Sequence, residues 1–394
     1  MTQAPTAGPS TAAGPALKPP PARAEERDRL AEDFVRLCEI ESPSGSEREM
    51  ADAVSAELRA AGIEVHEDES GRATGSQAGN LLARLPGPEG ARTILLCAHL
   101  DTVPLAAPVQ VLREAGAFHN AHEAILGADN KAAVAVLLGV GRRLAAEGSP
   151  VGVELLFTTC EELALRGVKE VDRTALHAEF GFVFDHASPI GELIVAAPTY
   201  YRVEARFHGA AAHAGIRPED GRSAIGAAVT ALAGLPTGRL DSETTANIGV
   251  IEGGSAANVV AEHCRLELEV RSLDDERASS VVGEVVDRMA EAASEAECDV
   301  ETTVEQLFRA YRLARSTPVV RAAAAALEAG GIEPIYVATG GGSDASALIA
   351  AGLPVLNVAN GTERNHQPDE SVTVEALETA LDLTFAIIAR SAEV

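Results

Sequence analysis

Side chains able to bind a metal ion stand where several apolar runs of the sequence end. One run ends in the segment CAHLDTVP, which contains an imidazole and a carboxylate. Another is followed by CEE, which contains two carboxylates, and three further positions each contribute one imidazole or carboxylate. The residues concerned are His99, Asp101, Asp129, Glu161, Glu162, Asp185 and His366. Mixed imidazole and carboxylate ligands suit zinc, with cobalt or manganese as alternatives. These residue types predict a site for divalent cations.

The expected secondary structure explains why these side chains should meet. Apolar runs alternate with helix-length segments, which predicts a mostly parallel sheet with helices on both faces. Such sheets bind ligands at the carboxyl ends of their strands. The strands are expected at 63–66, 80–85, 93–98, 153–159, 181–184, 335–338 and 354–358, and the helices at 25–38, 46–61, 130–146 and 318–329. The second helix is expected to begin at a capping box formed by Ser46 and Glu49.

Each candidate has a structural explanation when it is taken alone. Asp129 suits a helix N-cap, Asp101 a turn, and His99 a buried core histidine. The pair Glu161 and Glu162 suits the solvated start of a helix. Their common position at one sheet edge favours the metal site, because close carboxylates resist ionising together unless a cation is present. A nucleophile at Cys160 is disfavoured, since the neighbouring carboxylates raise a thiol pKa.

The middle of the chain has a different pattern. Its elements are expected at 201–208, 221–235, 246–251, 263–271, 274–296 and 299–306, in the order βαββαβ. That order is typical of ferredoxin-like α+β domains. We therefore predict an inserted lid and dimerisation domain over residues 197–309, called the lid domain below. The metal-binding catalytic domain is expected over 25–196 and 310–394, after a disordered tail over 1–24.

Composition limits the possible partners. The chain has 394 residues and a formal net charge of −27. That charge excludes general nucleic-acid binding and disfavours binding to anionic membranes, because both kinds of binding need basic residues on the protein. No apolar run reaches the roughly 18 residues that a membrane span needs. The five scattered cysteines, with no signal peptide, predict reduced thiols and a cytoplasmic protein.

Several longer motifs together resemble one family. They are CAHLDTVP, ILGADNKAAVAVLL, FVFD, AAHAGIRPEDGRSAI, ETTANIGVIEGGSAANVV and TGGGSDAS, joined by the EE pair. The chain resembles the peptidase T-like branch of the two-zinc aminopeptidase, aminoacylase and glutamate carboxypeptidase superfamily, over residues 25–389. One departure is Gln367, where relatives of this branch often have threonine.

The resemblance implies a role for each candidate. One metal would be held by His99 and Asp185, the other by Glu162 and His366, with Asp129 bridging them, Asp101 orienting His99 and Glu161 acting as general base. His213 would polarise the substrate carbonyl from the lid domain of a partner subunit. The alternative for His213 is that it caps a local turn beside Gly215. The substrate-anchoring positions would be Asn258, Arg271, Gly341, Gly342 and Ser343.

The expected function is cleavage of a peptide bond in short peptides. We predict an aminopeptidase acting on tripeptides, with two divalent ions as cofactors and a homodimer formed through the lid domain. One alternative is an amidohydrolase that deacylates N-acyl amino acids or small metabolites, because such enzymes share the same ligands. The other is a catalytically inactive metal-binding scaffold, which the presence of Glu161 disfavours.

Overall fold

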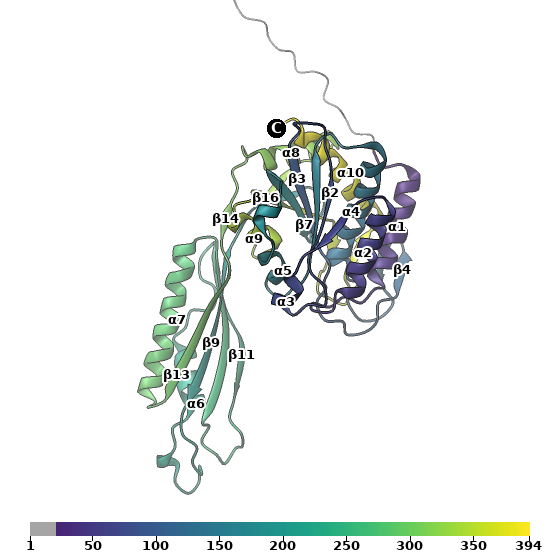
Figure 1. The fold of residues 1–394 in the computed structure, drawn as a ribbon. Coiled ribbons are helices and arrows are strands. Elements are labelled where there is room, and N and C mark those ends of the chain that lie inside the picture. The colour runs from purple at the N-terminus through teal and green to yellow at the C-terminus, as the bar shows by residue number, and fades with distance from the viewer. Residues whose placement is uncertain (1–20) are drawn as a thin grey trace, which may run out of the picture.

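The computed structural model describes residues 21–394. The chain forms a larger α/β domain and an elongated lid domain that extends from one side of it (Figure 1). The predicted fold class, a helix-covered sheet with an inserted α+β domain, is confirmed. Among the described residues no helix combines the length and apolar character needed to cross a bilayer.

A nine-stranded sheet forms the centre of the larger domain. The strand order is β1-β2-β6-β3-β7-β16-β8-β14, and β15 pairs with β8. The four pairings β3 with β6, β3 with β7, β16 with β7 and β15 with β8 are parallel, and the others in this sheet are antiparallel. The strands are β1 (Val65–Glu67), β2 (Leu81–Leu85), β3 (Thr93–His99), β6 (Gly152–Thr158), β7 (Phe180–His186), β8 (Glu192–Ala197), β14 (Tyr311–Arg312), β15 (Ile335–Ala338) and β16 (Val355–Ala359).

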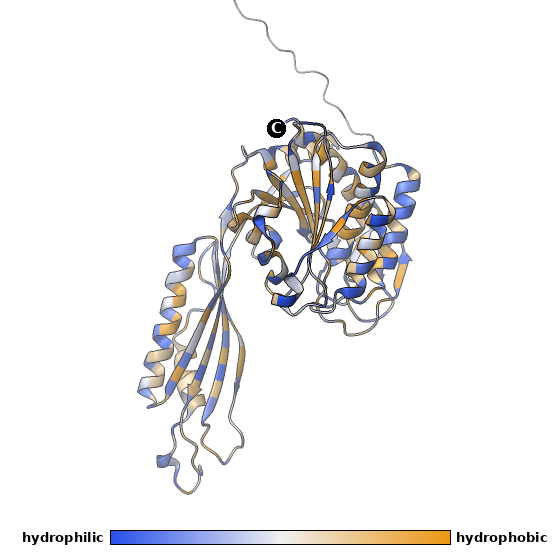
Figure 2. Cartoon of the chain, in the orientation of Figure 1, coloured by the Kyte–Doolittle hydropathy of each residue, from blue (hydrophilic) through white to orange (hydrophobic). Residues whose placement is uncertain are grey.

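Helices cover both faces of this sheet because its central strands are apolar on both sides. In β3, Ile94 and Leu96 join one buried cluster, whereas Leu95 and Cys97 join the other. The first cluster includes α1 (Ala24–Cys38), α2 (Arg48–Ala60), α4 (Ala128–Glu147), α8 (Pro318–Ala329) and α10 (Val374–Ser391). The second includes α5 (Arg166–Lys169) and α9 (Asp344–Ala350), and the short α3 (Ser70–Thr74) contacts α5. Figure 2 shows the sheet as mainly hydrophobic and the outer helices as mixed.

The lid domain is a five-stranded antiparallel sheet with two helices. The strand order is β10-β11-β12-β9-β13. Its elements are β9 (Thr199–His208), α6 (Ala224–Ala233), β10 (Gly238–Arg239), β11 (Thr244–Gly253), β12 (His263–Ser272), α7 (Asp275–Glu295) and β13 (Asp299–Phe308). Alternate strand residues such as Val203 and Leu266 pack against α6 and α7 in a separate buried cluster. These elements lie inside the range 197–309 given above.

Several details differ from, or extend, the sequence-based expectations. A second sheet of very short strands was not predicted; it contains β4 (Val111–Glu114), β5 (Ala117–Asn120), β17 (Thr362–Glu363) and β18 (Ser371–Thr373). The predicted capping box is wrong, because α2 begins at Arg48 and its N-cap is the buried Glu47. Most of the expected tail lies outside the described residues. At its end Ala22 is buried, and its N–H donates to Asp382.

Candidate metal centre

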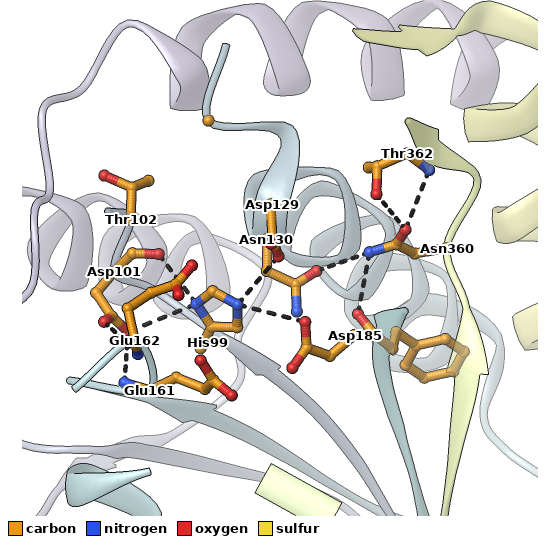
Figure 3. Close-up of polar contacts among 12 residues, drawn as sticks. His99, Asp101, Thr102, Asp129, Asn130, Glu161, Glu162, Asp185, Asn360 and Thr362 are labelled. Atoms are coloured by element: carbon orange, nitrogen blue, oxygen red, sulfur yellow. Dashed lines mark hydrogen bonds and ion pairs between the residues drawn. The ribbon is translucent and has the colours of Figure 1, made fainter. Parts of the chain in front are cut away.

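The structure brings the predicted metal-binding side chains together at one edge of the large sheet. His99 ends β3, Asp185 lies near the end of β7, and Glu161 and Glu162 come three and four residues after the end of β6. Asp129 stands at the start of α4, and His366 comes from the loop before β18. Ligand atoms of His99, Asp129 and Glu162 lie within 4.8 Å of one another, as do those of His99, Glu161 and Asp185. Figure 3 shows His99 at the centre of this group.

Asp129 lies between the two imidazoles. Its Oδ1 is 3.2 Å from Nε2 of His99, and its Oδ2 is 3.2 Å from Nε2 of His366. The same nitrogen of each imidazole also faces one more carboxylate. Nε2 of His99 is 3.5 Å from Asp185, and Nε2 of His366 is 2.8 Å from Glu162. The centre therefore has two halves. Each half has one imidazole and one carboxylate of its own, and both halves share Asp129.

Asp101 holds the surroundings of His99 in place. Its main-chain oxygen is 3.0 Å from Nδ1 of His99, so a proton on Nδ1 leaves Nε2 free to face Asp129. The side-chain oxygen Oδ1 is farther from Nδ1, at 3.5 Å. That side chain instead accepts the main-chain N–H groups of Glu161 and Glu162, at 2.9 and 3.1 Å, and the hydroxyl of Ser44 at 2.6 Å. Asp101 thus connects the histidine to the glutamate pair.

The electrostatics of the cluster suit a bound cation. Burial raises the pKa of Glu161 well above its usual range, and repulsion from Asp185 adds to this effect. Burial also raises the pKa of Asp185, to about 7. Hydrogen bonds to Asp129 and Glu162 raise the pKa of His366 to about 10. Protons thus offset the crowded negative charge, and divalent cations can replace them. The donor set therefore fits the divalent metals predicted from the sequence.

The structure divides the six residues expected to contact substrate into two groups. His213 and Asn258 are neighbours, because the N–H of Ala214 donates to the carbonyl of Asn258 and His213 forms a β-bridge with Val259. Both side chains are exposed, and Nδ1 of His213 accepts the N–H of Gly215. The loop between β9 and α6 lies at the end of the lid domain far from the large sheet (Figure 1). The structure does not bring this pair to the metal centre of its own chain.

The second group lies where the lid domain meets the larger domain. Arg271 stacks on the ring of Tyr200, with its guanidinium carbon 4.0 Å from the ring centroid, and pairs with Glu269. Its Nη1 donates to the carbonyl of Gly340, at 3.1 Å. Arg271 therefore contacts the loop that carries the other three candidates, Gly341, Gly342 and Ser343. Of these, Ser343 is buried as the N-cap residue of α9.

Sequence analysis missed several buried residues that support the centre. The amide of Asn360 donates to Oδ1 of Asn130 at 3.3 Å and to the carbonyl of Phe184 at 3.4 Å, and it accepts two hydrogen bonds from Thr362 (Figure 3). Asn357 bonds both main-chain groups of Asp185. Their only sequence signal is a polar residue inside or just after an apolar strand, and that signal is weak.

Two family models match the chain. The model described as "Peptidase dimerisation domain" matches residues 199–297, and "Peptidase family M28" matches residues 80–186. The uncharacterized protein YqjE of Bacillus subtilis is 35% identical over 366 residues, which cover 93% of this chain and 99% of YqjE.

The solved structures that are similar over nearly the whole chain include two that are more than 30% identical to it. The aminopeptidase PepT from Bacillus cereus has a TM-score of 0.85 at 36% identity. A tripeptidase from Staphylococcus aureus has a TM-score of 0.89 at 32% identity. Each comparison covers 93% of this chain and 99% of the other.

A helix-covered sheet with a metal-binding edge, joined to a domain of the peptidase dimerisation type, defines a metallopeptidase. The chain belongs to the peptidase T-like branch of the M20 metallopeptidases. The family predicted from the sequence motifs is confirmed.

Proposed function

We propose that the chain is a two-metal aminopeptidase that cleaves short peptides, with tripeptides as its main substrates. The observation that carries the proposal is the position of Asp129, whose two oxygens face two different imidazoles. A carboxylate shared in this way suits a pair of cations. Similarity to an aminopeptidase and to a tripeptidase supports the substrate class.

Each side chain of the metal centre has one role in this reaction. His99 and Asp185 would hold one cation, Glu162 and His366 would hold the other, and Asp129 would offer one oxygen to each. Zinc fits these ligands, with cobalt or manganese as alternatives. Asp101 orients His99 through its main-chain oxygen.

The reaction then depends on Glu161. When divalent cations are bound at the metal centre, they would supply a water whose pKa is lowered towards about 7. Glu161 is buried beside His99 and Asp185, whereas Glu162 lies beside His366. Glu161 takes the proton from the attacking water and passes it to the leaving amine. A general base positioned in this way typically raises the reaction rate about 10²–10⁴-fold.

Substrate binding is proposed to involve both domains and both subunits. Arg271 and the loop of Gly341, Gly342 and Ser343 bind the peptide from within the chain. His213 and Asn258 come from the lid domain of the second copy in a homodimer. The match of residues 199–297 to a dimerisation domain supports this arrangement, as does the distance of the His213 loop from its own centre.

The test combines metal removal with a substrate panel. Protein treated with a chelator should lose hydrolysis and regain it with Zn²⁺, Co²⁺ or Mn²⁺. Tripeptides with a free amino terminus should be cleaved faster than dipeptides, N-acetylated tripeptides and N-acyl amino acids. Full activity in protein shown to be free of metal would contradict the metal mechanism, and preference for N-acyl amino acids would identify a deacylase instead.

A further inference from the structure

Glu370 is a buried carboxylate placed directly behind the metal centre. Its side chain is 1% exposed, and it stands four residues after His366. Oε1 accepts the main-chain N–H of Asp129, and Oε2 accepts that of Gly127, both at 2.8 Å. Glu370 forms no ion pair within residues 21–394. Its carboxylate is therefore committed to main-chain donors at the start of α4.

These two hydrogen bonds fix the turn that presents Asp129. Gly127 has a left-handed φ of 76°, and Asp129 has non-helical angles of −82° and 102° inside the first turn of α4. Because a carboxylate at a helix N-terminus satisfies otherwise unpaired N–H groups, Glu370 stabilises this irregular turn. The direction of the Asp129 side chain follows from the turn.

Residues 366–370 thus contact Asp129 on two sides. His366 approaches its side chain at 3.2 Å, and Glu370 holds its main chain at 2.8 Å. One short segment consequently sets both the position of the shared carboxylate and the position of one imidazole.

We propose that Glu370 is a positioning residue for the metal centre. It holds Asp129 in the position where one carboxylate oxygen faces His99 and the other faces His366. This inference rests on the proposed two-metal function. Partners of metal ligands at this distance typically change metal affinity about 10–100-fold when they are replaced. A purely structural carboxylate would affect folding stability and leave metal affinity unchanged.

The test replaces Glu370 with a residue of the same shape. In Glu370→Gln, one of the two N–H groups faces an amide NH₂ instead of an oxygen and loses its acceptor. Glu154 offers a matched control, because it is also 1% exposed and accepts two main-chain N–H groups, of His177 and Ala178. It lies on β6 outside the cluster and pairs with Arg84.

Zinc affinity and stoichiometry of the metal-free full chain would be measured by competition with a chromogenic chelator. Thermal unfolding of the metal-free proteins would be measured in parallel. We expect both variants to lower the unfolding temperature. Only Glu370→Gln should weaken zinc binding, by about 10–100-fold at one or both sites.

Each outcome has a defined meaning. A folded Glu370→Gln protein with wild-type zinc affinity overturns the proposal, as does equal loss of affinity in Glu154→Gln. If Glu370→Gln does not fold, Glu370→Asp keeps the charge but draws the carboxylate back from the turn. That variant should also bind zinc more weakly, and wild-type affinity in it would equally overturn the proposal. A wild-type chain that binds no divalent cation would instead refute the proposed function itself.

Discussion

The main-chain N–H of Glu161 donates to Oδ1 of Asp101 at 2.9 Å. The neighbouring N–H of Glu162 uses the other oxygen of the same carboxylate. The main chain of the glutamate pair is therefore held independently of the two glutamate side chains. Either side chain can be changed with little effect on the position of the other.

This arrangement allows the roles of the pair to be separated. Glu161→Gln should retain both cations and lose about 10²–10⁴ in turnover, the value of a positioned base. Glu162→Gln should also lower metal content, because Glu162 lies 2.8 Å from Nε2 of His366. Metal analysis of the dialysed proteins, together with turnover, checks both expectations. Equal metal loss in the two variants would show that Glu161 is also a ligand.

The position of His213 predicts complementation between subunits. His213→Ala should lower turnover about 10²–10³-fold, the scale of one lost oxyanion donor, with no loss of metal. When His213→Ala and Glu161→Ala proteins exchange subunits, each heterodimer gains one site with both residues intact. Activity should then recover towards half of wild type. No recovery, with exchange verified by native mass spectrometry, would exclude action across the dimer.

The folding stability of the protein should depend on pH through the buried side chain of Asp344. Its Oδ1 is buried without a hydrogen-bond partner among the described residues, and Oδ2 accepts the hydroxyl of Thr158. Burial raises the pKa of Asp344 to about 6 from the ordinary 3.8. The folded protein therefore binds this proton more tightly than the unfolded chain, and stability is lost as the pH rises from about 4 to 6.

Asp344→Asn removes this buried charge. The variant should melt a few degrees higher than wild type at pH 8, when both proteins are free of metal, and the difference should shrink at pH 4. Calorimetry at the two pH values measures the effect. A variant that is less stable than wild type at pH 8 would mean that ionised Asp344 stabilises the fold.

Gly342 leaves no room for a larger residue beside Phe308 of the lid domain. A Cβ added at this position would collide with the ring of Phe308, at the end of β13. Gly342→Ala should therefore destabilise the protein by about 1–3 kcal/mol. The same change made in a Phe308→Ala background should cost much less, as denaturant unfolding would show. Identical costs in both backgrounds would place the strain elsewhere.

The grouping of these side chains could be predicted because most of them stand near the end of a long apolar strand or at the start of α4. Parallel strands such as β3 and β7 bring their carboxyl ends to one edge, so the position of His99 and Asp185 followed from the pattern alone. The βαββαβ order of the lid domain was also readable, because four of its five strands have ten residues each, and only the two-residue β10 was missed.

Other features gave too little local signal. Strands such as β17, with two residues, are too short to show any periodicity. Glu370 was missed because its partners lie far away in the sequence, as do the two groups to which Asn360 donates. The capping box failed because Glu47 turns inward, where it accepts the N–H groups of Gly45 and Cys160. Such tertiary contacts override a local capping motif.

The lid domain enters and leaves the larger domain through two neighbouring segments. Ala197 pairs with Tyr311, Tyr200 pairs with Phe308, and the hydroxyl of Thr199 accepts the N–H of Ala310. The two ends of a long insertion are thus already hydrogen-bonded partners. We therefore expect that a short hairpin turn can join them and that the larger domain can then be produced without the lid domain.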